Sequence, residues 1–236
     1  MKNALKTLAI VLVIMIAYSG SVLAQKKGKT FKGTVTYSLS YSGDGVEPAE
    51  LAKYPKESNI KVYESRTLIE QGPATIITNG ESKVVYTVVD LSSYGMKKYL
   101  ITQKTEEIEK ENKGTQYKYS EEGKEILGYK TKKVEITPPA KEDEEEDAAG
   151  SMKITAYYTE DMGGEEVNFG NQMFHGVKGF VLEYELVTPK ITIKATAKTI
   201  EKGKVKETDF MVPSDCTEVT KEAFEEEMRA LQGGGE

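Results

Sequence analysis

The chain has 236 residues, a formal net charge of −6 at pH 7 and 30% charged side chains. This acidic balance makes nonspecific binding to nucleic acid or to an anionic membrane unfavourable. Cys216 is the single cysteine, which excludes an intramolecular disulfide, so the fold depends on its hydrophobic core. Cys216 follows Pro213 in a predicted connection, where it is either a small buried residue or a thiol that pairs between chains.

The first 24 residues have the composition of a secretory signal peptide. Lys2 and Lys6 form a basic start, an uncharged apolar run follows, and Ala24 is the small residue before a cut at Gln25. The apolar run is short for a membrane span, although an uncleaved anchor is the alternative. No cysteine lies near the cut, which excludes a lipidated N-terminal cysteine. We therefore expect an exported chain, periplasmic or extracellular, that is not an integral membrane protein after cleavage.

Period-2 alternation predicts β-strands over most of the remaining chain. The clearest strand is 31–41, in which apolar residues alternate with Lys, Thr and Ser. Nine or ten strands are expected in total, and the further ranges are 59–64, 67–71, 74–78, 83–90, 97–102, 125–137, 152–158, 180–186 and 191–197. After a turn, the chain is expected to return along 205–212 as a further extended segment. Asn79-Gly80 predicts a tight hairpin turn, because both residues tolerate positive φ.

Helices are few in this pattern. A short helix is predicted at 48–54, and the Glu- and Lys-rich stretch 105–113 is either a surface helix or a loop. The C-terminal helix has the clearest signals, with Thr220 as N-cap and Gly233 as its stop. Together these elements predict an α+β, β-rich fold built on an antiparallel sheet, forming a single domain over 25–236.

Six acids fall within the seven residues Lys141 to Asp147. The regular ligand spacing of a calcium loop is absent, so a solvated, disordered loop near 140–150 is favoured over a calcium site. Strand patterns of one kind lie on both sides of this loop, which argues against a domain boundary there.

The sequence contains few residues or motifs that are typical of catalytic sites. His175 is the single histidine, and Cys216 lies in no recognisable nucleophile motif. No hydrolase, zinc-protease, P-loop or dinucleotide-binding motif occurs, and one His with one Cys makes a poor zinc set. Paired carboxylates of glycosidase type stay open, because 38 acids offer many pairs. We expect no enzyme activity, no metal and no cofactor, and we interpret His175 as a loop residue.

The stretch FHGVKGFVLEYEL, which begins at Phe174, combines a glycine turn with a strand. Gly176 and Gly179 permit a tight turn, and Phe180, Leu182 and Tyr184 then alternate on one predicted strand face. This order resembles the signature of the GLPGLI-type proteins and related families of uncharacterised secreted bacterial envelope proteins. Lys178 replaces the proline of the namesake pattern, so the resemblance is to a sister family.

Three further stretches agree with that resemblance: 128–133, 156–159 and the F-x-x-P at 210–213. At fold level such proteins are similar to the LolA-like half-barrel, a curved antiparallel sheet partly covered by helices. The resemblance implies an envelope location and a cavity for an apolar ligand, and it implies no catalytic residues. Two hypotheses follow: a non-catalytic protein that holds a lipid or acylated ligand in the concave face of its sheet, or an adaptor module that binds other envelope proteins. A hydrolase is disfavoured.

Overall fold

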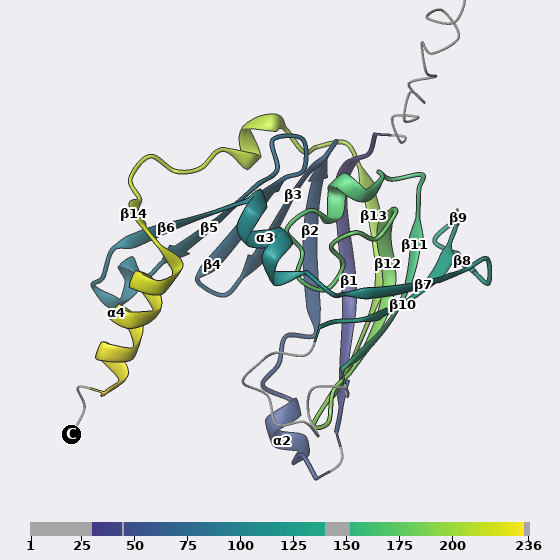
Figure 1. The fold of residues 1–236 in the computed structure, drawn as a ribbon, viewed down its shortest axis with the longest axis horizontal. Helices are drawn as coiled ribbons and strands as arrows, with labels where there is room; N and C mark the ends of the chain where they lie inside the picture. The colour runs from purple at the N-terminus through teal and green to yellow at the C-terminus, as the bar shows by residue number, and fades with distance from the viewer. Residues whose placement is uncertain (1–29, 44, 140–151, 234–236) are drawn as a thin grey trace, which may run out of the picture.

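The computed structural model describes residues 30–43, 45–139 and 152–233 (Figure 1). It contains one curved, unclosed sheet of twelve strands, a separate two-stranded hairpin and short helices, with a helix at the C-terminus. The predicted β-rich α+β fold class is therefore confirmed. The predicted signal peptide, with its cut between Ala24 and Gln25, and the acidic loop near 140–150 lie outside the described residues.

The longest strands, β1 and β13, lie at the centre of the large sheet, and the strands at its two edges are short. The strands of the large sheet are β1 (Lys32–Ser42), β2 (Glu57–Tyr63), β3 (Arg66–Gln71), β4 (Ala74–Asn79), β5 (Val84–Asp90), β6 (Lys98–Lys104), β7 (Gln116–Ser120), β10 (Lys132–Thr137), β11 (Lys153–Thr159), β12 (Phe180–Val187), β13 (Thr192–Lys202) and β14 (Thr217–Val219). The small hairpin is formed by β8 (Glu125–Ile126) and β9 (Tyr129–Lys130). The helices are α2 (Pro48–Leu51), α3 (Thr105–Glu111) and α4 (Lys221–Gly233), with 3-10 turns η1 (Ser92–Tyr94), η2 (Glu165–Asn168) and η3 (Glu207–Phe210).

The strands of the large sheet follow the spatial order β14-β6-β5-β4-β3-β2-β1-β13-β12-β11-β10-β7. All neighbours are antiparallel except β14, which pairs in parallel with β6. The two eleven-residue strands β1 and β13 lie side by side at the centre, so the two ends of the fold are hydrogen-bonded to each other. Strands on both sides of residues 140–151, β10 and β11, also pair directly.

Three expectations about the elements are corrected by the structure. The sheet has more strands than expected, partly because β7 had no clear signal in its five residues. The range 125–137 is not one strand region, because Leu127 and Gly128 adopt positive φ and fold β8 onto β9 before β10 begins. The range 205–212 does not return as a strand but crosses the sheet with η3 in its middle. The open choice at 105–113 is settled as α3.

The residues between β11 and β12, 160–179, cover the concave face of the sheet. We call this segment the inner connection and the sheet face beneath it the inner face. Its buried apolar side chains divide among three core clusters: Met162 and Val167 join Val35 and Tyr37 of β1, Phe174 and Val177 join the β10–β12 cluster, and Phe169 joins Val85 of β5 and Ile108 of α3. The inner connection thus takes the place that a covering helix would otherwise fill.

The opposite, outer face of β3–β5 is covered by a second segment. Residues 203–216, which we call the outer strap, bring Phe210 against Leu68 and Ile77. Ile77 pairs with Tyr86 of β5, which contacts the same cluster. The outer strap thus covers one face of β3–β5, and Phe169 of the inner connection with Ile108 of α3 covers the other face of β4 and β5.

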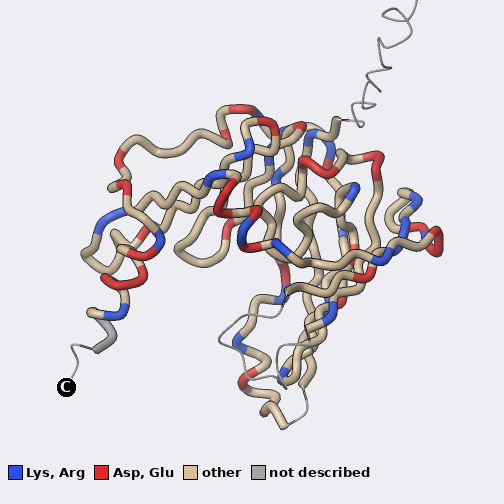
Figure 2. Tube along the Cα trace, viewed as in Figure 1, with Lys and Arg blue, Asp and Glu red and all other residues tan. Residues whose placement is uncertain are grey.

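The C-terminal helix packs on the first edge of the sheet. The rings of Phe224 and Tyr99 lie 5.2 Å apart, and the Tyr99 hydroxyl donates to Glu227 Oε1 at 2.6 Å. The predicted N-cap is confirmed, because Thr220 Oγ1 accepts from the Ala223 amide at 3.2 Å. In the described ranges no helix is long and apolar enough to cross a membrane. Figure 2 shows acidic and basic residues interspersed along the strands and connections.

The turn between β4 and β5 differs from the predicted one. Asn79 pairs with Val84, which leaves a four-residue loop, and positive φ occurs at Lys83 instead of at Asn79 or Gly80. Asn79 Oδ1 organises this loop by accepting from two backbone amides, those of residues 81 and 82, at 3.1 Å each. Gly80 is required for a different reason: a Cβ there would lie 1.9 Å from the carbonyl oxygen of Glu166 in η2.

We predict that Gly80→Ala lowers the free energy of unfolding by about 2–3 kcal/mol, because the added methyl group overlaps a backbone carbonyl that cannot rotate away. Gly72→Ala is the matched control, since its Cβ would have nothing within 4 Å and would suffer only the strain of φ +57°, about 1 kcal/mol. Urea unfolding of both variants measures the difference. Equal losses would show that the hairpin loop does not rest on the inner connection.

Candidate functional site

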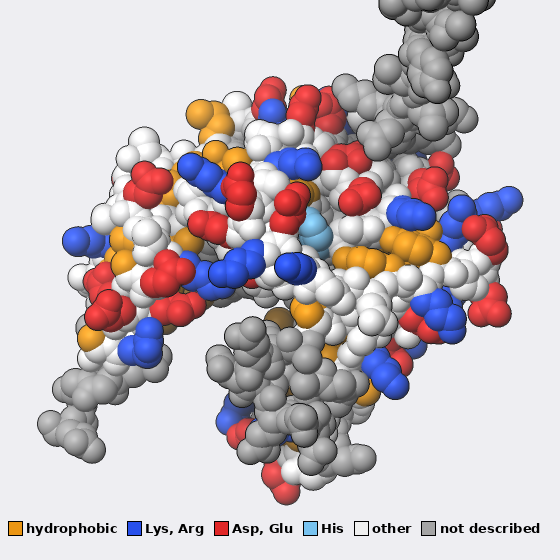
Figure 3. Space-filling view, in the orientation of Figure 1, with side chains coloured by type: hydrophobic (Ala, Val, Ile, Leu, Met, Phe, Trp, Pro, Cys, Tyr) orange, Lys and Arg blue, Asp and Glu red, His pale blue; other side chains and the backbone are white. Residues whose placement is uncertain are grey.

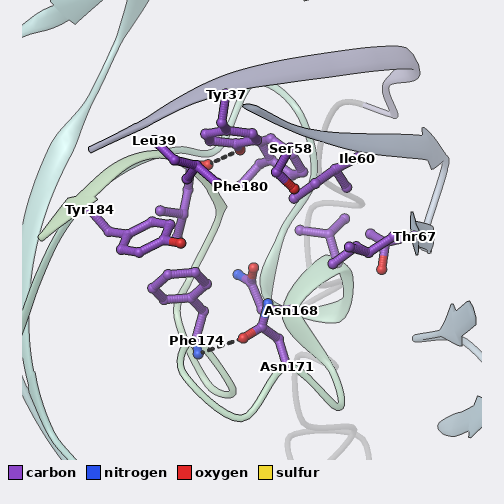
Figure 4. Close-up of a pocket in the computed structure, with 13 residues that line it drawn as sticks. Tyr37, Leu39, Ser58, Ile60, Thr67, Asn168, Asn171, Phe174, Phe180 and Tyr184 are labelled. Atoms are coloured by element: carbon purple, nitrogen blue, oxygen red, sulfur yellow. Dashed lines mark hydrogen bonds between the residues drawn. The ribbon is translucent and has the colours of Figure 1, made fainter. Parts of the chain in front are cut away.

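A cavity of about 60 Å³ lies on the inner face, between the sheet and the inner connection (Figure 4). The surrounding gap, including space open to solvent, is about 500 Å³. Its walls come from β1–β3 (Tyr37, Leu39, Ser58, Ile60, Thr67 and Ile69), from the inner connection (Val167, Asn168, Asn171 and Phe174) and from β12 (Phe180, Val181 and Tyr184). The expected concave site therefore exists, but the inner connection fills most of it.

The strands β1–β3 each present one face to the cavity, and the wall that they form is mostly apolar. Leu39 and Ile60 contribute aliphatic surface and are only half-buried, so they remain accessible from the mouth. Tyr37 is buried, and its hydroxyl donates to the carbonyl oxygen of Val181 on β12. Burial raises the pKa of the Tyr37 hydroxyl well above its ordinary value, so the group stays protonated and keeps this bond.

Asn168 fixes the opposite wall. Its side chain is buried, and Nδ2 donates to the carbonyl oxygens of Val177 at 2.9 Å and Gly179 at 2.7 Å. Those two acceptors tie η2 to the last residues of the inner connection. Within the described part of the chain no hydrogen bond reaches Asn168 Oδ1, and this oxygen belongs to a residue that lines the cavity. The cavity therefore offers an amide acceptor in a mostly apolar surrounding, to which Ser58 and Thr67 add hydroxyl groups.

The glycine turn is held by two tyrosines of the edge strand β7. The Tyr117 hydroxyl donates to the carbonyl oxygen of His175, and the Tyr119 hydroxyl donates to that of Gly176 at 2.9 Å. Gly176 has φ +80°, and a Cβ at Gly179 would lie 2.5 Å from the carbonyl oxygen of Thr159. Both glycines are therefore needed to let the inner connection lie close against the sheet.

The three residues that the alternation grouped on one face of β12, Phe180, Leu182 and Tyr184, all contact one core cluster. Phe180 and Tyr184 line the cavity, together with Val181. Leu182 does not line it and lies fully buried in the core. A β-bulge lies at this place: Tyr157 pairs with Glu183 whereas Tyr158 pairs with Val181, which shifts the register by one residue.

Sequence reasoning missed Asn168 and the hydroxyl-bearing residues Ser58 and Thr67. No motif marks them. The one local signal for Asn168 is its place between the apolar residues Val167 and Phe169, in a stretch without strand periodicity. Only the fold shows that this residue is buried and bonded to its own connection.

His175 lies in the inner connection as a half-buried loop residue. Its ring centroid is 5.7 Å from that of Phe169, and its Nδ1 is buried without a partner among the described residues. Burial is the main reason that its pKa is lowered, and the nearby acids Glu165 and Glu109 act in the opposite direction. In the described residues no group of three or more His, Cys, Asp and Glu side chains is placed to hold a metal ion.

The lowered pKa of His175 predicts a pH dependence of stability. The folded state prefers the neutral ring, so the free energy of unfolding should fall as pH drops from about 6.5 to about 5, where the unfolded histidine is protonated. Most carboxylates titrate below this window, which leaves His175 as the main titrating side chain. Unfolding of tag-free protein at several pH values should show the fall in the wild type and its loss in His175→Gln. An unchanged slope in the variant would refute this role.

Comparisons with known proteins give a likeness of fold. No family model and no curated protein matches the chain. Among solved structures it is similar to PNGF-II, with 16% identity and a TM-score of 0.52 over 82% of this chain and 32% of that one. The Mycobacterium tuberculosis lipoprotein LppX superposes with 12% identity over 74% of this chain and 89% of that one, at a TM-score of 0.32.

The likeness to PNGF-II shows the fold alone, and the chain spans about a third of the length of that protein. The TM-score with LppX is below the level at which a shared fold can be inferred. The resemblance to GLPGLI-type families has no support from the family models. The half-barrel character therefore rests on the curved, unclosed sheet itself (Figure 1).

Proposed function

We propose that the protein is an exported, non-catalytic binding protein of the bacterial envelope, and that its inner cavity holds one end of an apolar ligand. An acyl chain of a lipid or of an acylated partner fits this chemistry. The observation that carries the proposal is the cavity on the concave face, which has mostly apolar walls and an open mouth. Export is supported by the signal-like first 24 residues, and the absence of activity by the thin catalytic inventory of the sequence.

The size of the cavity limits what it accepts. Pockets for drug-sized ligands have volumes of roughly 300–1,000 Å³, whereas this cavity has about 60 Å³. It therefore takes the end of a chain and not a whole lipid. The hydrogen bonds of Asn168 and of the two β7 tyrosines hold the inner connection in place, which opposes enlargement of the cavity.

The remainder of such a ligand has a path along the sheet. Ile69, at the cavity, pairs with Ile76 of β4, and Ile76 pairs with Thr87 of β5. All three side chains are half-buried and share the inner face. This row extends away from the cavity, and Ile76 packs there with Phe169 of the inner connection and Ile108 of α3. A chain whose end is buried beside Leu39 would continue past Ile69 toward these side chains.

An adaptor module that binds other envelope proteins is the second candidate. The observation in its favour is that Tyr94 and Met211 stay largely exposed, at 77% and 68%. On the face seen in Figure 3, however, apolar side chains gather in small groups among charged ones. Exposed apolar residues that are scattered in this way are normal for a protein surface, so the cavity is the stronger indication.

A cavity-filling substitution tests the binding proposal. Leu39→Trp should fill the cavity and weaken the binding of 1-octanol, measured by calorimetry, at least tenfold, about 1.4 kcal/mol. Leu127→Trp is the matched control, because Leu127 is exposed on the β8–β9 hairpin, and it should bind as the wild type does. Native mass spectrometry of protein exported by its own host should also show a bound apolar molecule.

The proposal fails if the wild type carries no apolar molecule and binds no octanol, or if Leu39→Trp and Leu127→Trp bind octanol equally well. Circular dichroism and urea unfolding of both variants exclude loss of the fold as the cause of weaker binding.

A further inference from the structure

A second cavity lies on the outer face of the sheet, over β3–β5, and it shares only β3 with the strands that line the inner cavity. Its volume is about 340 Å³, which falls within the range of small-molecule pockets. It is lined by residues of β3–β5 and of the outer strap: Arg66, Ile77, Asn79 and Tyr86 from the strands, and Glu207, Thr208, Phe210 and Met211 from the strap. It lies on the opposite side of the sheet from the inner cavity, so the two sites are separate.

One end of this outer cavity is rich in hydrogen-bond donors. Arg66 has five N–H donors, and Nη1 donates to Glu207 Oε1 at 2.6 Å. Among the described residues, Glu207 is the hydrogen-bond partner of the Arg66 guanidinium. The Arg66 side chain is 27% exposed and that of Glu207 is 63% exposed, so the carboxylate can swing into solvent while the guanidinium stays at the cavity. Asn79 uses its Oδ1 in the β4–β5 loop, which leaves its NH₂ group as a donor beside the cavity.

The choice of arginine at this place is informative. The chain is rich in lysine, and its two arginines are Arg66 and Arg229. A guanidinium binds a carboxylate through two parallel N–H···O bonds, whereas an ammonium acts as a point charge. Position 66 therefore has the side chain suited to planar, two-oxygen recognition.

The other end of the outer cavity is apolar. Ile77 and Phe210 are buried and form its floor, and half-buried Tyr86 forms a side. Met211 stands at the rim with 68% of its surface exposed. Its unbranched, flexible side chain can close over a bound apolar group without moving the backbone.

We propose that the outer cavity binds a small amphiphilic carboxylate. The ligand carboxylate replaces that of Glu207 on the Arg66 guanidinium, and its apolar part packs on Ile77, Tyr86 and Met211. A singly charged head suits the site better than a dianion, because Glu207 stays nearby and repels additional negative charge. This site does not depend on the function proposed for the inner cavity.

Decanoate and 1-decanol are the probes, since they share an apolar chain and differ in the head group. All proteins carry Leu39→Trp, so that binding at the inner cavity does not contribute, and calorimetry measures both affinities. The parent should bind decanoate at least tenfold more tightly than decanol. Arg66→Gln should lose that preference, and Arg229→Gln, the matched control, should keep it. Glu207→Gln should bind decanoate more tightly, because no carboxylate competes for Arg66.

Loss of the preference in Arg66→Gln alone supports the site. Retention of the preference in Arg66→Gln, or no binding of decanoate by the parent, overturns it. If Arg66→Gln does not fold, Arg66→Lys tests the proposal instead. Lysine keeps the positive charge but cannot form the two parallel N–H···O bonds of a guanidinium. The preference should then shrink severalfold, and an undiminished preference would equally overturn the proposal.

Discussion

The attachment of the inner connection to the concave face is the constraint on which the rest of the structure depends. Asn168 donates to two carbonyl oxygens near the end of this connection, and the β7 tyrosines hold the glycine turn from the other side. These bonds place Val167 and Phe174 against the sheet and leave only a small cavity beside them. The same attachment reaches β4, because η2 approaches the backbone of Gly80.

The strands β3–β5 need cover on both faces. In β4, Ile76 packs on the inner side and Ile77 on the outer side, so neither face of this strand suits water. The inner connection and Ile108 of α3 cover one face, and the outer strap covers the other. Neither segment fills its space completely, and the two cavities are the result. The inner cavity is small and mostly apolar, whereas the outer one is larger and has an arginine at one end.

Local pattern predicted what depends on neighbouring residues in the chain. Alternation identified β1 and most of the other strands, and a Thr followed by an apolar stripe identified α4 and its N-cap. It failed where distant contacts decide the conformation. Gly80 was interpreted as a positive-φ turn residue, but its real constraint is a carbonyl oxygen 86 residues further along the chain. Phe180 and Tyr184 were placed at the site, whereas Asn168, which holds it together, had no local signal.

The central claim is that the inner cavity holds the end of an apolar ligand, and a crystal structure of the protein exported by its own host tests it most directly. The protein must be purified without detergent, so that a native ligand is retained. The account predicts elongated electron density that begins between Leu39 and Phe174 and continues past Ile69 toward Ile76. A cavity that contains only ordered water, hydrogen-bonded to Asn168 Oδ1, would contradict it.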